Sequence, residues 1–242
     1  VSYLLLPTFY KQSDISRELR DELLNKFNLD LTFNQSLVYN FFPRPHFVSK
    51  ETSIIKNHKN IADINHIKIY ISLDNLFSLK NFNVTDVILE NVNFELNSKN
   101  SNFFIKILNN NFLDANLKII NSNIFFRNFE NEVLFINKIK NLKYYYDPNE
   151  LENVLISENE IFNIPFSLEA INKEYKKILF TKLNLDYAKL QIENIFNYDD
   201  DVKLGSSTLF FNKKKVFLII KLIKIFLNLI TLMNWKKINF YT

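Results

Sequence analysis

The sequence predicts a mainly β protein of the α+β class, in which an N-terminal amphipathic helix precedes a curled, elongated antiparallel sheet. Apolar and polar residues alternate with the period of a strand from Leu29 almost to the C-terminal end. A helical repeat precedes that point, and Asn and Asp are frequent between the alternating segments. Strands joined by such turns, with no long helix between them, favour an antiparallel meander over β-α-β units.

The composition excludes several kinds of site. Of the 242 residues, 47% are hydrophobic and 15% aromatic, which is enough to bury a sizeable core. The chain has no Cys, which excludes disulfides, thiolate catalysis and Cys-based zinc sites. Its one Gly, Gly205, excludes the Gly-rich loops that hold phosphate groups, and it leaves Asn and Asp as the main turn residues.

The net positive charge of the chain comes from its C-terminal tail. The formal net charge is +4, but residues 213–242 contain seven of the 30 basic residues and none of the 26 acidic ones. The rest of the chain therefore carries 23 basic against 26 acidic residues. No nucleic-acid partner is predicted, because nucleic-acid-binding domains concentrate basic residues on one surface.

Residues 1–10 begin with an apolar run, Val1–Pro7. A bilayer takes about 20 residues to span, so this run alone is too short. One interpretation is the outer end of a membrane anchor; the other is a short buried strand or a loose terminus. The segments that follow favour the anchor remnant.

A helix of about four turns is predicted next. Ser13 and Asp14 provide the expected N-cap. One face of the helix is apolar and comprises Ile15, Leu19, Leu23 and Phe27. We expect this face to pack against one end of the sheet, which is a structural role.

A Pro-containing segment follows two short apolar runs, Leu29–Phe33 and Leu37–Phe42. Pro has no N–H to give to a strand ladder, and it restricts the residue before it to extended geometry. The segment is therefore predicted to be an extended sheet edge, comprising Phe42, Pro43, Arg44, Pro45, His46 and Phe47. It is either a functional contact or a rigid edge that ends a strand pair.

The alternation predicts further strands and two short helical segments. The strands are expected at residues 53–56, 66–73, 82–96, 117–126, 133–146, 154–156, 161–171, 178–196 and 208–211. The helical segments are expected at 73–79 and 102–109, and a hairpin turn at 128–131. One-residue offsets at Asn91 and Ala188 indicate bulges or bends within strands.

The tail, residues 213–242, differs from the rest of the chain. Val216–Met233 is almost wholly apolar, and the only Met and only Trp of the chain lie in the tail. Three interpretations compete: a membrane span weakened by two lysines, an amphipathic surface helix, or translation in a wrong frame. We favour the frameshift, because another frame of A/T-rich codons restores acidic residues and alternation. As written, the segment predicts a C-terminal apolar helix.

Four stretches of the chain together resemble the N-terminal part of AsmA-family proteins. They are LLLPTF, ISRELRDELLNKF, LDLTFNQSLVYNFFPRPHF and NHIKIYISLDNLFSLKNFNVTDVILENVNFEL. The likeness covers roughly residues 1–210, and it divides the chain into an anchor remnant (1–10), an AsmA-like helix and β-groove domain (11–212) and the tail (213–242). Departures from the family pattern are the absent N-terminal Met and cytoplasmic flank, the scarcity of Gly, and the tail.

The resemblance implies a protein of the bacterial inner membrane, with a single N-terminal anchor and its bulk in the periplasm. A long apolar β-groove would carry phospholipid between the inner and outer membranes, with acyl chains and the inner membrane as partners. An apolar sheet face is compatible with this role, because each buried CH₂ contributes about 0.8 kcal/mol. The expected groove walls are Ile67, Ile69, Ile71, Val87, Leu89, Val92, Phe94, Leu183, Leu185 and Tyr187.

Two other interpretations of the apolar residues stay open. Walls of a lipid groove and core residues of a sandwich have the same sequence pattern. The alternative function is a non-enzymatic periplasmic β-rich scaffold, or an assembly factor that binds outer-membrane assembly proteins.

Catalysis, metal binding and cofactors are not predicted. The three histidines, His46, His58 and His66, lack metal-ligand spacing. Asp199–Asp201 is more typical of a solvated turn than of a cation site. No pairing of a nucleophile with a base can be proposed from the sequence, so an enzyme is not expected.

Overall fold

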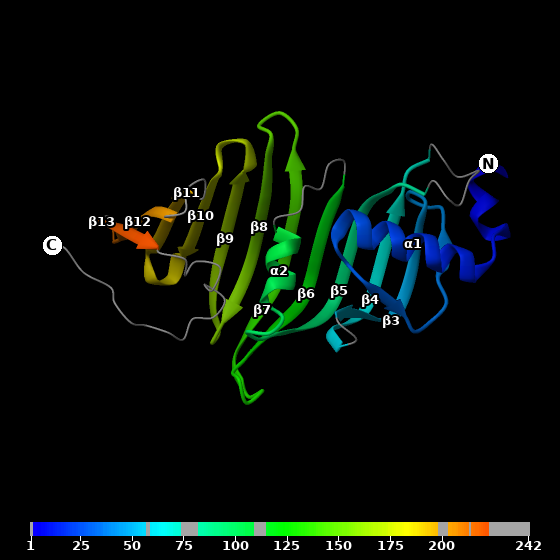
Figure 1. The fold of residues 1–242 in the computed structure, drawn as a ribbon, viewed down its shortest axis with the longest axis horizontal. Coiled ribbons are helices and arrows are strands. Elements are labelled where there is room, and N and C mark those ends of the chain that lie inside the picture. Colours follow the sequence, from blue (N-terminus) through cyan, green and yellow to red (C-terminus); the bar gives the residue numbers. More distant parts are fainter. Residues whose placement is uncertain are drawn as a thin grey trace.

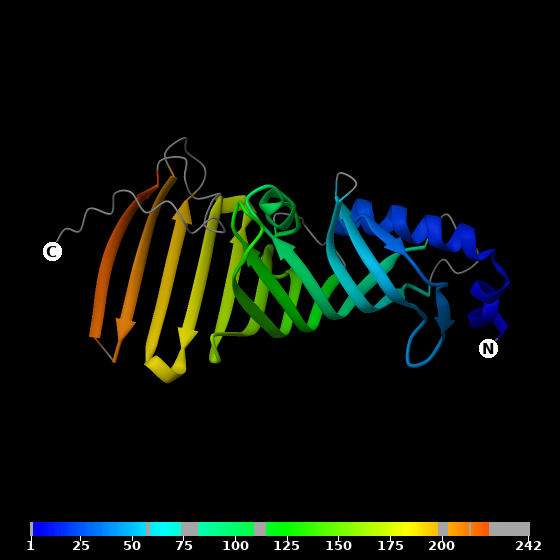
Figure 2. The same ribbon diagram turned by 90° about the horizontal axis from the view of Figure 1, so that it is seen from below.

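A computed structural model describes residues 2–56, 59–73, 82–108, 115–197, 203–212 and 214–222. One long twisted sheet runs through the molecule, with η1 (Ser2–Phe9) and β13 (Lys214–Leu222) at opposite ends (Figure 1). The two α-helices, α1 and α2, lie on the same face of this sheet (Figure 2). The predicted mainly β fold, with few helices, is confirmed.

The strands follow one another across the sheet in nearly their order along the chain. They are β1 (Leu31–Phe33), β2 (Val38–Asn40), β3 (His46–Lys56), β4 (Lys59–Ile71), β5 (Val84–Leu96), β6 (Asn116–Arg127), β7 (Val133–Asp147), β8 (Glu152–Ile161), β9 (Ile164–Lys173), β10 (Ile178–Leu185), β11 (Leu190–Asn197), β12 (Lys203–Phe211) and β13. Both β1 and β2 pair with β3.

Helix α1 (Gln12–Phe27) buries the predicted apolar face. Its four core residues are at most 1% exposed, and they are Ile15, Leu19, Leu23 and Phe27. The helix ends where Asn28 adopts φ 55° and its N–H reaches back to the last carbonyls. The N-cap prediction is wrong by two to three residues: the carbonyl of Lys11 already accepts the N–H groups of Asp14 and Ile15, so Ser13 and Asp14 lie in the first turn.

One pair of strands departs from the predicted antiparallel meander. β5 and β6 are parallel, and the chain between them crosses over the sheet through α2 (Ser101–Leu108). The helix predicted at 102–109 is therefore confirmed, but it packs on the face of the sheet and not at an edge. The Phe104 ring lies 5.9 Å from that of Phe94, and Phe103 is part of the core.

The segment 178–196 is two strands and not one strand with a bulge. β10 ends at Leu185, the 3-10 turn η4 (Asp186–Ala188) reverses the chain, and β11 begins at Leu190. Lys189 closes the turn with φ 48° and donates its N–H to the carbonyl of Asp186. The offset in the alternation was therefore the signature of a tight hairpin.

The Pro-containing segment is an extended edge only in part. Phe42–Arg44 form a bend, whereas His46 and Phe47 are the first residues of β3. Both pair with β2 on one side and β4 on the other, and both are buried, so they are interior residues of the sheet. The prediction of an edge failed because β2 and β4 both pair with β3 at these two residues.

The predicted C-terminal helix is not present at its start. Residues 216–222 belong to β13, which pairs antiparallel with β12 over nine residue pairs. An open sheet edge offers unpaired N–H and C=O groups, which an apolar extended segment satisfies. The rest of the predicted helix, and the helical turn at 74–79, lie outside the described residues.

A line of interrupted strand pairing crosses the sheet from β3 to β7, and it ends at a β-bulge where β7 pairs with β8. Glu51, Asn91 and Asn121 have φ angles of 50°, 55° and 49°. Asn65 in β4 and Lys140 in β7 lie beside them and are skipped in the strand register. The offset predicted at Asn91 is thus confirmed, as one member of a bend that runs across five strands.

Truncation of the helix face should test how strongly α1 closes the core. Leu19 is fully buried beneath the sheet's inner face. We expect Leu19→Ala to lower the free energy of unfolding by about 2–5 kcal/mol, because a cavity remains. Leu24→Ala, on the exposed side of the same helix, should change it by about 0.5 kcal/mol or less. Urea unfolding followed by circular dichroism measures both, and equal losses would contradict this packing.

Candidate functional site

The candidate site is the apolar inner face of the sheet, the face on which α1 and α2 lie. Adjacent strand partners share a face, so the registers trace this face from Ile69 and Val87 through Leu117 and Tyr144 to Leu155. All five are buried in one core cluster. The apolar face thus extends beyond the helices. Its first half, which includes β4 and β5, differs from its second half, β9–β12, in which elements cover it.

The predicted groove walls in β4 and β5 are core residues and not walls of an open groove. Ile67, Ile69, Ile71, Val87, Leu89, Val92 and Phe94 are all at most 4% exposed. They belong to the same cluster as Ile15, Leu19, Leu23 and Phe27 of α1. Helix α1 therefore occupies this part of the inner face, and a ligand has no access to it in this structure.

The inner face of β9–β12 has no such cover among the described elements (Figures 1 and 2). Its apolar residues are mostly half-buried, and they form two rows across the strands. One row is Leu168, Leu183, Ile192 and Leu209; the other is Phe166, Leu185, Leu190 and Phe211. We call these eight residues the open apolar face.

Three predicted residues fall near this face, and the structure separates them. Leu183 and Leu185 belong to the open apolar face. Tyr187 does not: it lies in the turn η4 and is 88% exposed. The other six members were not predicted as site residues, although the alternation in 161–171 and 190–192 was a signal that could have identified them.

Charge divides the two sides of this half of the sheet. None of the eight residues of the open apolar face is ionisable, and the one ionisable residue of β9–β12 that the registers place on the same side is Lys203, the first residue of β12. The outer side carries Glu169, Lys182 and Glu193, which are neighbours across three strands. Lys173 lies 2.9 Å from Glu152 on that side, and the hydrogen bond to Glu152 raises the pKa of the lysine. The inner side is therefore suited to an uncharged, apolar partner.

A short ladder of hydrogen-bonded polar residues crosses the inner face of β10–β12 next to the open apolar face. The amide nitrogen of Asn194 donates to the Thr181 hydroxyl at 3.0 Å, and the Ser207 hydroxyl donates to the Asn194 amide oxygen. These three residues face inward, beside the row that contains Leu183. The ladder sets a polar limit to the apolar rows on one side.

Gly205 packs directly against an aromatic ring at the end of this face. A Cβ at this position would lie 2.4 Å from Cδ1 of Phe196, its partner in β11. The absence of a side chain lets the Phe196 ring lie over the backbone of β12, where it is buried. The one Gly of the chain therefore has a packing role.

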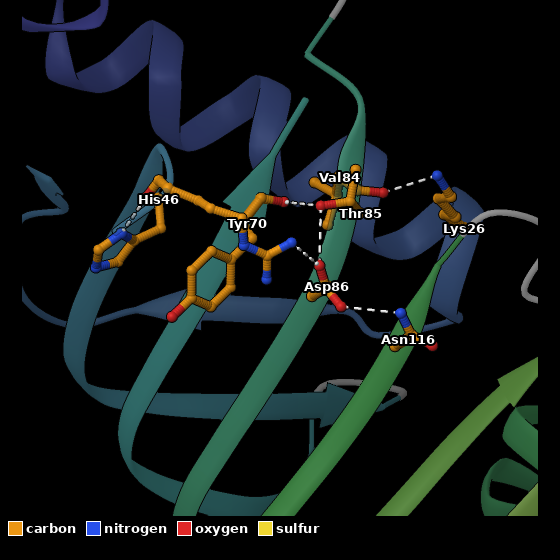
Figure 3. Close-up of polar contacts among 8 residues, drawn as sticks. Lys26, His46, Tyr70, Val84, Thr85, Asp86 and Asn116 are labelled. Atoms are coloured by element: carbon orange, nitrogen blue, oxygen red, sulfur yellow. Dashed lines mark hydrogen bonds and ion pairs between the residues drawn. The ribbon is translucent and has the colours of Figure 1, made fainter. Parts of the chain in front are cut away.

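A second cluster of polar residues lies on the opposite side of the sheet, between β3 and β6 (Figure 3). Arg44 pairs with Asp86 at 3.0 Å and stacks over the Tyr70 ring, while Asn116 donates to the other oxygen of Asp86 at 2.9 Å. The His46 ring stacks on Tyr70, and its Nδ1 lies 2.7 Å from the Arg44 carbonyl oxygen. The contacts of Arg44 and His46 hold the Pro-containing segment on the sheet, and the Asn116–Asp86 hydrogen bond joins β6 to β5 beside it.

No catalytic or metal site emerges from the described part of the chain. It contains no group of three or more residues placed to hold a metal ion. A shallow pocket of about 410 Å³ lies at the η4 end of β10–β12, lined partly by Asp186 and Lys189. No described helix is long and apolar enough to cross a membrane.

Comparison with known proteins gives no family for this chain. No family model matches it, and no curated protein matches it.

Substitution of the glycine should test the packing at the end of the open face. We expect Gly205→Ala to lower the free energy of unfolding by about 1–3 kcal/mol, because the new Cβ must displace the Phe196 ring. The neighbouring Ser206→Ala faces outward and should change it by about 0.5 kcal/mol or less. Denaturant unfolding of both variants measures the difference; a neutral Gly205→Ala would show that the ring does not lie over Gly205.

Proposed function

We propose that this protein binds phospholipid acyl chains on the open apolar face of β9–β12, as a non-enzymatic lipid-handling protein. One observation carries the proposal: beyond the half that α1 fills, the inner face of the sheet presents two rows of uncharged apolar residues that no described element covers. Among the described elements, a helix covers the apolar side of the sheet in the first half only.

The size and chemistry of the open apolar face fit an alkyl chain. Neighbouring strands lie about 4.8 Å apart, so each four-residue row extends about 14 Å across the sheet. An acyl chain that lies along such a row buries apolar surface on both partners, at about 0.8 kcal/mol per CH₂. No group on this face needs a charged or metal partner, which is consistent with a ligand that has none.

The AsmA-family resemblance of the sequence supports the same proposal from another side. Under it, the protein would be anchored in the bacterial inner membrane and would handle phospholipid in the periplasm for outer-membrane biogenesis. Its lipid track would then be β9–β12 and not the predicted β4 and β5 residues, because α1 fills the latter.

A protein ligand is the second candidate. The ladder of Thr181, Asn194 and Ser207 favours it, because hydrogen-bonding side chains on an otherwise apolar face serve a peptide better than an alkyl chain. The molecule would then be a periplasmic scaffold or assembly factor.

Native mass spectrometry of the purified chain separates the two. We expect phospholipid to co-purify with the wild type, and Leu183→Glu to lose most of it, because a carboxylate in the row opposes acyl burial. The matched control is Asn184→Glu, one residue along β10 and on the outer side, which should keep the lipid.

Circular dichroism of both variants establishes that they fold. A wild type that carries no phospholipid and takes up none from added lipid contradicts the proposal and favours the protein ligand. Equal retention by Leu183→Glu and Asn184→Glu places the lipid elsewhere and also contradicts it.

A further inference from the structure

One rim of the sheet carries a series of exposed aromatic turns. From β6 onward the described hairpins turn alternately at two rims, and the turns at 128–132, 162–163 and 186–189 all lie on the same one, the lower edge in Figure 1. The last residue of β12, Phe211, belongs to this rim too, and each of the three turns holds an aromatic residue. Phe129 is 83% exposed, Phe162 is 75% exposed and Tyr187 is 88% exposed. We call this edge the aromatic rim.

The opposite rim is poorer in apolar residues. Within the described part of β6–β13, exposed large hydrophobic residues occur in turns and at the first or last residues of strands on both rims. The aromatic rim has six: Phe129, Val133, Phe162, Ile164, Tyr187 and Phe211. The other rim has two, Leu151 and Tyr175. Within the described residues of β6–β13, exposed apolar side chains at turns and strand ends are therefore concentrated on the aromatic rim.

Phe162 has a left-handed backbone conformation, which is unfavourable for a bulky side chain. It and Asn163 form the two-residue turn between β8 and β9, with φ angles of 52° and 62°. A turn with two positive φ angles favours Asn or Gly, and a bulky side chain there is strained. The Phe162 ring is nevertheless exposed, and its centroid lies 6.4 Å from that of the Phe135 ring. The ring therefore lies largely in solvent at a position where Asn or Gly would suit the backbone better.

The spacing and charge of the rim identify a bilayer interface as the partner. Successive turns on one rim are two strands, or about 10 Å, apart. Isolated aromatics at that spacing, with Asn, Asp and Lys between them, do not form the contiguous dry patch of a protein interface. They can each enter the headgroup region of a bilayer, where amphipathic rings are favoured. The described turn charges, from Glu130, Glu132, Asp186, Lys189 and Lys214, nearly cancel, which fits a zwitterionic surface.

We propose that the aromatic rim docks on the surface of a zwitterionic phospholipid bilayer, with Phe129, Phe162 and Tyr187 as its anchors. The two apolar rows of the open face lie between this rim and the Thr181–Asn194–Ser207 ladder. Docking therefore brings the apolar rows next to the lipid. The inference rests on the proposed function, to which it adds the side of the sheet from which an acyl chain would enter. The residues that carry it are those of the aromatic rim and not those of the open apolar face.

Flotation with phosphatidylcholine vesicles tests the rim in the full chain. The rim variant combines Phe129→Ser, Phe162→Asn and Tyr187→Ser. We expect its partition into the vesicles to fall at least about tenfold, since three rings no longer enter the interface. The control variant combines Leu151→Asn and Tyr175→Ser on the opposite rim, and it should bind as the wild type does. Leu151 is a matched control for Phe162, because it is also apolar with a positive φ, 55°.

Stability and lipid occupancy distinguish docking from the other roles. Phe162→Asn should leave the thermal unfolding midpoint unchanged or raise it, because Asn suits the turn. The rim variant should still carry phospholipid in native mass spectrometry, which separates this inference from the proposed function. Absence of vesicle binding by the wild type, undiminished binding by the rim variant, or equal losses in both variants would each overturn the docking proposal.

Discussion

The apolar inner face of the sheet is the constraint on which the rest of the structure depends. A single sheet exposes this face to water unless another layer covers it. Here α1 and α2 cover β3–β7, and the buried side chains of that half form one cluster with the helix residues. The chain supplies no comparable described layer over β9–β12, whose inner residues are half-buried. The molecule therefore has a closed half that stabilises it and an open half that is available for a ligand.

The two halves also differ in how their strands bend and how the chain turns between strands. The closed half bends along a line of interrupted strand pairing, where Asn91 and Asn121 take left-handed backbone angles that Asn tolerates well. The open half consists of short strands joined by tight turns, with Asn163, Lys189 and Asn212 at positive φ. With one Gly in the chain, other residues supply every described left-handed position. The large apolar turn residues among them, Leu151 and Phe162, are those least suited to a left-handed backbone.

Local pattern predicted much of the fold. The stripe Ile15, Leu19, Leu23 and Phe27 identified α1, and alternation identified most strands and the offset at Asn91. Longer-range relations were not predictable in this way. The parallel pairing of β5 with β6 depends on where α2 packs, and the interior position of His46 depends on β4. Tyr187 was misplaced because a tight hairpin and a bulge produce the same one-residue offset.

The candidate site illustrates the same limit. Ile67 and Leu183 have equivalent sequence patterns, one apolar residue among alternating polar ones. Only the position of α1 separates a core residue from a residue of the open apolar face. Burial by a distant helix depends on tertiary packing, so it cannot be predicted from the local periodicity of the sequence.

Accessibility of single cysteines measures this difference most directly, because the chain contains no other thiol. Leu183→Cys and Ile69→Cys should be compared for their rate of reaction with a maleimide under native conditions. The account predicts rapid labelling at position 183, slowed by added phospholipid, and protection at position 69 until the protein unfolds. Equal protection at both positions would show that the second half of the inner face is also closed, and it would contradict the account.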